Sequence, residues 1–212
     1  MQFDHFEIVE IAIEAGLSIM DVYDSSVQIE VQSKEDDSPL TKADIAAHKT
    51  IIRGLSTINP EVPVVSEEGR VGDPKKSELA WLVDPLDGTK EFIKRNGMFT
   101  VNIALMKRMG PQWKPIFGVV HAPVNRTTWF GGVDVPATKI TDAETSEISV
   151  KKQTSTQPRL VASGSHRAER DEKFARELGD HELVRMGSSL QACIVAEGSA
   201  DLYPRFGPTS CW

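Results

Sequence analysis

The sequence predicts an α/β fold in two parts, an α+β half over residues 1–133 and an α/β half over residues 134–212. Three observations predict it. Apolar residues recur at helical spacing near the N-terminus, short β-branched and aromatic segments crowd the middle, and strand-like and helix-like segments alternate after residue 158. A chain of 212 residues has room for one large domain or two small ones that pack closely.

Two helices are expected at the start of the chain. Residues 3–23 place apolar side chains such as Phe6, Val9 and Ile13 three or four positions apart, which forms one stripe on a helix. Residues 41–55 show the same pattern after a polar stretch. Thr41 is the expected N-cap of this second helix, because its hydroxyl can accept a hydrogen bond from the first turn.

A sheet is expected in the middle of the chain, where β-branched and aromatic residues are separated by Pro and Gly. The predicted strands cover residues 63–66, 78–84, 99–106, 116–123 and 127–132. Residues 134–157 are mostly polar, and only Ile148 to Val150 have strand character. This stretch is therefore expected to be a surface excursion between the two parts.

The second part alternates between the two types of element. Strands are expected over residues 160–165, 181–185 and 201–206, and helices over residues 168–178 and 188–197. This order is typical of an α/β arrangement.

The composition excludes several kinds of partner. The chain has 24 Lys and Arg against 31 Asp and Glu, a net charge of −7, so its overall field does not favour nucleic acid. No apolar stretch is long enough to span a bilayer, although peripheral membrane association and the oligomeric state stay open. Only Cys193 and Cys211 occur, without metal-ligand spacing, and the N-terminus lacks signal-peptide features. A cytoplasmic protein is expected.

The most informative segment is WLVDPLDGTKEF, residues 81–92. An apolar run places Asp84 at the end of a strand, Asp87 follows three residues later, and Gly88 permits unusual backbone angles. Both carboxylates should then face one point. Together with the carbonyl of Leu86 they form the hard oxygen set that Mg²⁺ prefers.

The same residues are also those of an ordinary surface turn, and this alternative stays open for the segment taken alone. A second acidic element changes the balance, because Glu67 and Glu68 directly follow the short strand at 63–66. Ligands of open α/β sheets bind beyond such strand ends. Two acidic strand ends together favour a metal site over two solvated corners.

Further motifs carry a resemblance to a known family. The chain contains, in order, TKAD at 41–44, SEEG at 66–69, the segment at 81–92, FTVNIAL at 99–105, ASGSHR at 162–167, GSSL at 187–190 and VAEGSADLYPRFGPT at 195–209. This series resembles the inositol monophosphatase superfamily of magnesium-dependent, lithium-sensitive phosphatases. DGTKEF resembles its 3′(2′),5′-bisphosphate nucleotidase branch more than the inositol monophosphatases, which tend to carry DGT-x-NF.

The resemblance implies a fold, a metal set and a water-activating pair. The fold would be the layered αβαβα sandwich of inositol monophosphatase and fructose-1,6-bisphosphatase. Two or more Mg²⁺ ions would be held by Glu67, Asp84, the Leu86 carbonyl and Asp87. Thr89, with Asp44 as partner, would orient the attacking water, and Gly88 and Thr89 would donate to the phosphate. Asp44 is equally well placed to favour a helix N-terminus, and both roles stay open.

Substrate recognition is expected from the second part of the chain. The resemblance places His166, Ser188 and Arg205 beside a phosphorylated nucleotide, and arginine can hold phosphate through two hydrogen bonds. His166 and Ser188 are also ordinary capping residues for the helices that follow them. Gln191 stands where the family usually has lysine, so a doubly phosphorylated nucleotide is expected to bind more weakly.

A second departure concerns the end of the sequence. In the family a Trp-Asp pair and a last structural segment follow PRFGPT, and that Asp is a ligand of the second metal. This sequence ends at Trp212. The resemblance therefore implies that this ligand and the C-terminal segment are missing, and that two-metal catalysis is impaired.

The expected function is Mg²⁺-dependent hydrolysis of the 3′-phosphate of adenosine 3′,5′-bisphosphate to AMP, with 3′-phosphoadenylyl sulfate as a second substrate, in sulfur assimilation. A phosphatase for inositol or other sugar monophosphates is the nearest alternative, favoured by Gln191. A catalytically impaired nucleotide- or metal-binding protein is an alternative of another class. A binding module with solvated acidic loops is a third.

Overall fold

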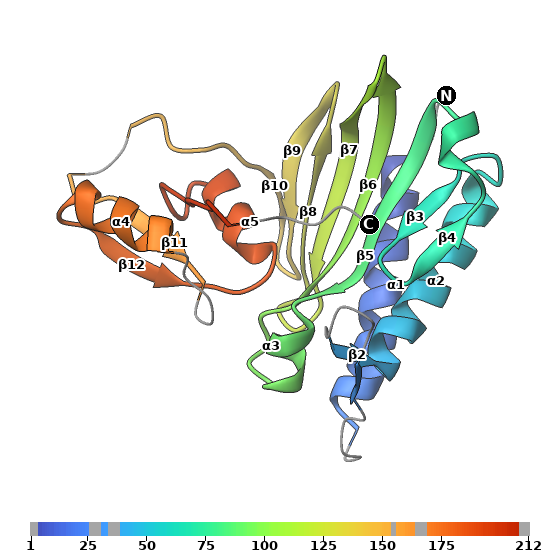
Figure 1. Cartoon of the computed structure of the whole chain (residues 1–212), viewed down its shortest axis with the longest axis horizontal. Coiled ribbons are helices and arrows are strands. Elements are labelled where there is room, and N and C mark those ends of the chain that lie inside the picture. The colour runs from blue at the N-terminus through green and yellow to red at the C-terminus, as the bar shows by residue number, and fades with distance from the viewer. Residues whose placement is uncertain (1–3, 26–30, 34–38, 154–155, 164–168, 208–212) are drawn as a thin grey trace.

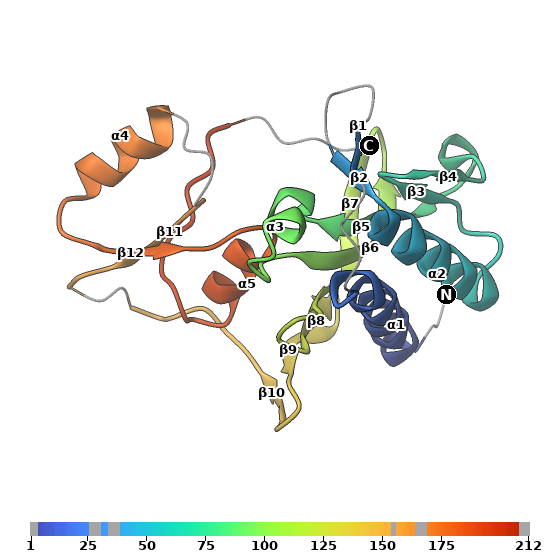
Figure 2. The ribbon, with the colours of Figure 1, turned by 90° about the horizontal axis from the view of Figure 1, so that it is seen from below.

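The computed structural model describes residues 4–25, 31–33, 39–153, 156–163 and 169–207. Figure 1 shows a large sheet in the middle of the molecule, with two long helices on one side and the C-terminal elements on the other. The turned view in Figure 2 shows the same succession. No helix within these ranges is long and apolar enough to cross a membrane.

The two N-terminal helices form as predicted. Helix α1 covers His5–Tyr23 and helix α2 covers Lys42–Ile58. Thr41 caps α2, since its hydroxyl accepts a hydrogen bond from the amide of Ala43. The helices contact each other, and α1 packs on strand β7 and α2 on strand β5. The predicted apolar stripe of each helix therefore faces the sheet.

The large sheet has eight strands among the described residues, in the order β10-β9-β8-β7-β6-β5-β3-β4. All neighbours are antiparallel except β3 and β5, which run parallel. The strands are β3 (Val64–Ser66), β4 (Gly69–Val71), β5 (Leu79–Asp87), β6 (Thr100–Met109), β7 (Gln112–Ala122), β8 (Thr127–Gly132), β9 (Val135–Ile140) and β10 (Thr145–Glu147). All five strands predicted in the middle of the chain are present.

The expectation of a surface excursion over residues 134–157 is wrong for its first half. β9 and β10 continue the sheet beyond β8, whereas residues 148–150 form no strand. These strands are polar because they lie at the outer edge of the sheet, where the edge strand pairs on one side only. The division of the chain at residue 133 stays a prediction, and the sheet itself runs past it.

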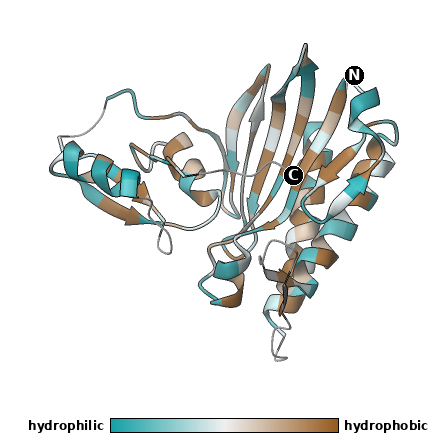
Figure 3. Cartoon of the chain, viewed as in Figure 1, coloured by the Kyte–Doolittle hydropathy of each residue, from teal (hydrophilic) through white to brown (hydrophobic). Residues whose placement is uncertain are grey.

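One apolar cluster fills the space between the sheet and helices α1 and α2. Its members include Ile8, Ile19, Ile51, Trp81 and Ile103, each with at most 2% of its surface exposed. Figure 3 shows hydrophobic residues recurring along both helices and along the central strands. This cluster carries most of the burial that stabilises the fold.

The C-terminal elements form a smaller unit. Strands β11 (Arg159–Ala162) and β12 (Glu182–Arg185) pair in parallel, and helices α4 (Glu169–Leu178) and α5 (Leu190–Ala196) accompany them. The strand predicted over 201–206 is reduced to a single bridge between Leu202 and Leu160, because no further pairing partner extends it. α5 lies between the large sheet and β11-β12, with α4 at the far end (Figures 1 and 2). The predicted mixed α/β architecture is confirmed.

Short elements connect these layers. They are β1 (Val31–Ser33), β2 (Pro39–Thr41), a 3-10 turn over Pro74–Lys76 and helix α3 (Thr89–Ile93). α3 is held by Phe92, which is fully buried; its ring centroid lies 5.3 Å from those of Tyr23, in a tilted contact, and Phe99, in an edge-to-face contact. This aromatic contact fastens the segment after Asp87 to the main core.

Candidate active site

Acidic residues meet at one end of strands β3 and β5. The two strands are parallel, with Ser66 beside Val83, so the residues that follow these positions, Glu67 and Asp84, lie at the same end of the sheet. The amide of Glu67 donates to the carbonyl of Val83 at 3.0 Å. The sequence predicts that the strand ends at Asp84, and this prediction is wrong for β5. The strand continues to Asp87 with an irregularity in its pairing with β6.

Asp84 has one unsatisfied carboxylate oxygen. Its side chain is buried, and its Oδ1 atom has no hydrogen-bond partner within the described structure. Burial, followed by the charges of Asp87 and Glu67, raises the pKa of Asp84 well above its usual value. A buried acceptor without a donor, crowded by two more carboxylates, is an environment that a bound cation would satisfy.

The donor set suits magnesium rather than a metal that needs a complete protein cage. Within the described ranges no group of three or more His, Cys, Asp or Glu side chains is arranged to hold a metal ion by itself. The crowding of Asp84 by Asp87 and Glu67 shows that their charges are near enough to interact. Such a set of carboxylates is compatible with Mg²⁺, which binds through one or two carboxylates and keeps several waters.

Asp44 fills the capping role left open by its sequence, and its second oxygen lies near Thr89. Its Oδ2 atom accepts hydrogen bonds from the amide and the hydroxyl of Thr41, at 2.7 and 2.6 Å, which closes a capping box at the start of α2. Its Oδ1 atom lies 3.4 Å from the hydroxyl oxygen of Thr89, which is also 3.3 Å from the carbonyl of Leu86. The fold therefore brings Asp44 and Thr89 together across 45 positions of sequence.

Asp87 is held by the residues that precede α5. Its Oδ2 atom accepts from the amide of Ser189, the hydroxyl of Ser189 and the hydroxyl of Ser188, each at 2.7 Å. Ser188 was expected to contact substrate or to cap the helix. Its hydroxyl donates to Asp87, and its expected contact with substrate stays a prediction. Ser189, the residue at the N-cap position, makes no side-chain cap bond. The C-terminal unit thus fixes the orientation of a candidate metal ligand.

Sequence reasoning missed the rest of this network. Asn102 donates to the Ser189 hydroxyl at 2.8 Å and to Asp87 at 3.4 Å, and Thr100 contacts both Ser188 and Asn102, at 2.7 and 3.0 Å. Thr100 is fully buried. The available signal was two polar residues inside the otherwise apolar strand FTVNIAL.

Gly88 permits the close approach of these segments. Its φ is +94°, and an added Cβ would lie 3.0 Å from the carbonyl oxygen of Met98 and 3.2 Å from Cβ of Ser188. A larger residue would strain the backbone and separate the loop from Ser188. Its expected donation to phosphate stays a prediction.

The remaining substrate candidates lie in a different group. Gln191 is buried, donates to the carbonyl of Met186 at 2.9 Å and accepts from the Tyr203 hydroxyl at 2.7 Å. Arg205 is exposed and donates to the same hydroxyl at 3.3 Å. His166 lies outside the described residues. The structure therefore links Gln191 to Arg205 through Tyr203, and their expected contact with substrate stays a prediction.

Known proteins resemble the chain over nearly all of its length. The inositol monophosphatase family matches residues 3–212. A protein of Escherichia coli strain K12 named 3′(2′),5′-bisphosphate nucleotidase CysQ is 47% identical over 212 residues, covering 97% of this chain and 82% of that protein. The protein of the same name from Salmonella typhimurium is 46% identical over 216 residues, with the same coverage of both chains.

A solved structure agrees with these matches. CysQ from Bacteroides thetaiotaomicron, titled a bacterial member of the inositol monophosphatase family, superimposes with a TM-score of 0.80 at 35% identity. The superposition covers 96% of this chain and 80% of that one. The predicted resemblance and the predicted assignment to the hydrolases of this family are both confirmed. Fold, acidic strand ends and sequence agree, and the chain belongs to the inositol monophosphatase family.

Proposed function

We propose that the protein is a Mg²⁺-dependent phosphomonoesterase that converts adenosine 3′,5′-bisphosphate to AMP, with 3′-phosphoadenylyl sulfate as a second substrate. The observation that carries the proposal is the unpartnered, buried Oδ1 of Asp84 beside Glu67 and Asp87, next to the Asp44–Thr89 contact. The names of relatives at 46% and 47% identity support the choice of substrate.

The metal would be held by Glu67, Asp84, the carbonyl of Leu86 and Asp87, in a site for two or more ions. Bound magnesium would polarise the phosphoryl group, lower the pKa of a coordinated water and stabilise the leaving oxygen. In the free protein, burial, followed by repulsion from Asp87 and Glu67, holds the pKa of Asp84 above its usual value. Ionised Asp84 therefore gains a counter-charge when the site is loaded, so the crowding favours cation binding.

Thr89 and Asp44 would orient the attacking water. The two groups nearest the Thr89 hydroxyl, Asp44 Oδ1 and the Leu86 carbonyl, are both acceptors, so this hydroxyl donates its proton to one of them. The lone pairs of Thr89 are then available to accept a hydrogen bond from water. Asp44 is fixed for this task because its other oxygen is held by Thr41.

The substrate would be held from both sides of the site. The backbone amides of Gly88 and Thr89 would donate to the scissile phosphate, and Arg205 would bind the second phosphate, with His166 and Ser188 beside the nucleotide. Gln191 would act through Tyr203 and Arg205, because its amide is buried and bonded within the C-terminal unit. The expected lithium sensitivity, cytoplasmic location and place in sulfur assimilation rest on the family resemblance and stay predictions.

The proposal is tested by phosphate release with Mg²⁺, comparing adenosine 3′,5′-bisphosphate with inositol 1-phosphate. We expect a higher kcat/KM for the bisphosphate nucleotide, and no measurable turnover for the Asp84→Asn variant. Arg126→Ala is the matched control, because Arg126 forms an exposed ion pair with Asp142. Its activity should equal that of the wild-type protein.

A second candidate function is a phosphatase for inositol or other sugar monophosphates. It is favoured by Gln191, a buried neutral side chain at a position where the family usually has a cation. A higher kcat/KM for inositol 1-phosphate would select it. Magnesium binding without turnover of either compound would instead indicate a metal-binding protein without this catalytic activity.

A further inference from the structure

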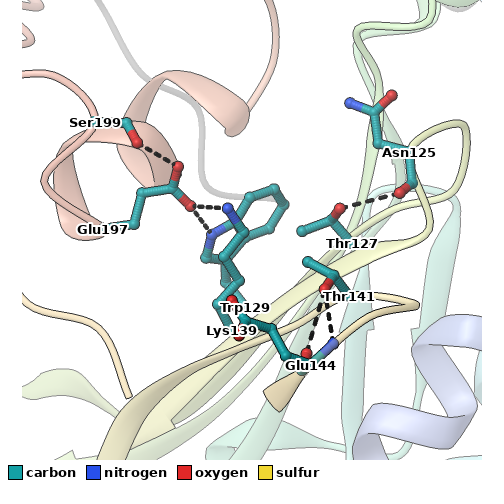
Figure 4. Close-up of polar contacts among 8 residues, drawn as sticks. All are labelled: Asn125, Thr127, Trp129, Lys139, Thr141, Glu144, Glu197 and Ser199. Atoms are coloured by element: carbon teal, nitrogen blue, oxygen red, sulfur yellow. Dashed lines mark hydrogen bonds and ion pairs between the residues drawn. The ribbon is translucent and has the colours of Figure 1, made fainter. Parts of the chain in front are cut away.

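Helix α5 is attached to the large sheet at both of its ends. Before its first residue, Ser188 and Ser189 hold Asp87. Directly after its last residue, Glu197 contacts strands β8 and β9, as Figure 4 shows. The second attachment takes no part in the chemistry proposed above.

The contact at Glu197 is specific and largely enclosed. Its Oε2 atom accepts from the indole N–H of Trp129 at 2.8 Å and pairs with the ammonium of Lys139 at 2.8 Å. Its Oε1 atom accepts from the hydroxyl of Ser199 at 2.7 Å. The Glu197 side chain is 10% exposed and that of Lys139 is 28% exposed. We call Glu197, Trp129 and Lys139 the latch.

The latch carries a charge that its surroundings stabilise. Burial alone would raise the pKa of Glu197, but hydrogen bonds from Lys139, Ser199 and Trp129 outweigh it and hold the pKa below its usual value. Glu197 is therefore an anion at neutral pH. The Lys139 ammonium also lies 5.6 Å from the centroid of the Trp129 ring, so Lys139 contacts both other members of the latch.

Among the described residues, the apolar contact between α5 and the sheet is small. It is a cluster in which the buried residues Leu190 and Cys193 of α5 meet Ala122 and Trp129. Trp129 therefore serves twice, through its ring in this cluster and through its N–H in the latch. The seven residues of α5 are the whole connection between Ser189 at one end and Glu197 at the other, so the two attachments are linked through a single short helix.

We propose that Glu197 is a positioning residue for Asp87. By fastening the end of α5 to Trp129 and Lys139, it holds Ser188 and Ser189 against Oδ2 of Asp87 and thereby sets the direction in which this carboxylate faces the metal site. The inference rests on the proposed function, because it takes Asp87 to be a metal ligand.

The test is Mg²⁺ binding by titration calorimetry on the full chain without substrate, for wild type, Ser189→Ala, Glu197→Gln, Lys139→Met and the Ser189→Ala/Glu197→Gln double variant. Loss of a group that orients a metal ligand weakens metal binding by about 10- to 100-fold, so about tenfold is expected for Ser189→Ala. Glu197→Gln and Lys139→Met should each weaken it by about threefold to tenfold. The loss of Mg²⁺ affinity in the double variant should be much smaller than the product of the two single losses, since both substitutions act through one carboxylate.

Asp201→Asn is the matched control. Asp201 is 3% exposed and pairs with Lys151 and Arg159 in the same C-terminal unit, so its loss weakens that unit without touching the latch. Its Mg²⁺ affinity should equal that of the wild type. Amide exchange of residues 188–196 should accelerate in Glu197→Gln, and added Mg²⁺ should slow it again.

The outcomes separate the possibilities. Wild-type affinity in Glu197→Gln, with weakened binding in Ser189→Ala, would overturn the proposal. Equal losses in Glu197→Gln and Asp201→Asn would also overturn it, because the effect would then be general loosening. Absence of Mg²⁺ binding in the wild type would overturn both this inference and the proposed function. Mg²⁺ binding without hydrolysis of either phosphate would reject the proposed function alone, and the affinities would still decide on the latch.

Discussion

The large unit is stabilised by an apolar core, whereas the C-terminal unit is attached to it by a small interface that is largely polar. Helices α1 and α2 and the large sheet share a continuous apolar core of fully buried side chains. The C-terminal unit meets the sheet through a cluster of four buried residues and through hydrogen bonds at the two ends of α5. None of the residues of α4 is buried. The carboxylates of the candidate site thus stand on the unit with the large core, whereas the three shortest hydrogen bonds to the Asp87 side chain come from Ser188 and Ser189 of the less densely packed unit.

This difference has a consequence for function. An apolar core tolerates little movement, because close-packed side chains have few alternative arrangements. Polar contacts at a smaller interface open more readily, since their free energy depends on a few bonds that water can replace. The orientation of Asp87 should therefore respond to changes in the C-terminal unit that leave the sheet intact.

The largest effect is expected in the main core. Phe99 is fully buried between Tyr23 and Phe92. Phe99→Ala should lower the free energy of unfolding by about 3–5 kcal/mol, because it removes a buried aromatic ring and leaves a cavity. Chemical denaturation followed by circular dichroism measures this value. A loss below about 1 kcal/mol would show that the core is not the main source of stability.

A similar truncation in the small cluster should act locally. Leu190→Ala should cost about 2 kcal/mol, at the low end for leucine, because partly exposed neighbours can close the gap. Hydrogen exchange should accelerate in α5 and remain unchanged in β6. Equal acceleration in both elements would mean that the two units unfold together, and would contradict the idea that the C-terminal unit opens more readily than the sheet.

A smaller effect is expected for the polar network around Asp87. Asn102→Ala removes the donor to Ser189 and Asp87 and should lower stability by about 1 kcal/mol, the usual contribution of a hydrogen-bonded side chain. Thermal unfolding measures it. Gln112→Ala, an exposed change on the neighbouring strand, is the control and should stay within about 0.5 kcal/mol of the wild type.

The latch should make the stability of the interface depend on pH. The pKa of Glu197 in the folded protein lies below its ordinary value of 4.5, so the stability that it contributes is complete above that pH. This contribution is lost as the pH falls through the folded-state pKa. The difference in melting temperature between wild type and Glu197→Gln should therefore shrink on acidification. A constant difference would show that the charge of Glu197 contributes nothing.

The smallest effect is expected at the surface. Arg126 and Asp142 form an ion pair at 2.6 Å, but their side chains are 75% and 60% exposed. Arg126→Ala should change the free energy of unfolding by less than about 0.5 kcal/mol, because water and salt screen such pairs. Denaturation at two salt concentrations checks this. A larger loss at low salt would show that this ion pair stabilises the turn between β7 and β8 more than its exposure indicates.

Much of the fold follows from local patterns. The helical stripes of residues 3–23 and 41–55 and the five central strands are apolar in the period of the element that they form, and the structure confirms them. The cap at Thr41 needs only residues of the first turn. Strands β9 and β10 escaped prediction because polar edge strands are defined by the neighbour with which they pair, here β8 and each other.

Some residues of the candidate site can likewise be recognised in the sequence, whereas others become evident only in the folded structure. Glu67, Asp84 and Asp87 are recognisable in the sequence because each follows or ends an apolar strand, and their approach needs only the parallel pairing of β3 with β5. The contacts of Ser188 and Ser189 with Asp87, and of Glu197 with Trp129 and Lys139, join residues far apart in the chain. Hydrogen bonds of that kind leave no periodic trace in the sequence, since any polar residue can supply them once the fold has placed it. Local periodicity and strand-end carboxylates thus predicted the elements and the candidate metal ligands, and only tertiary packing decided which side chains hold those carboxylates in place.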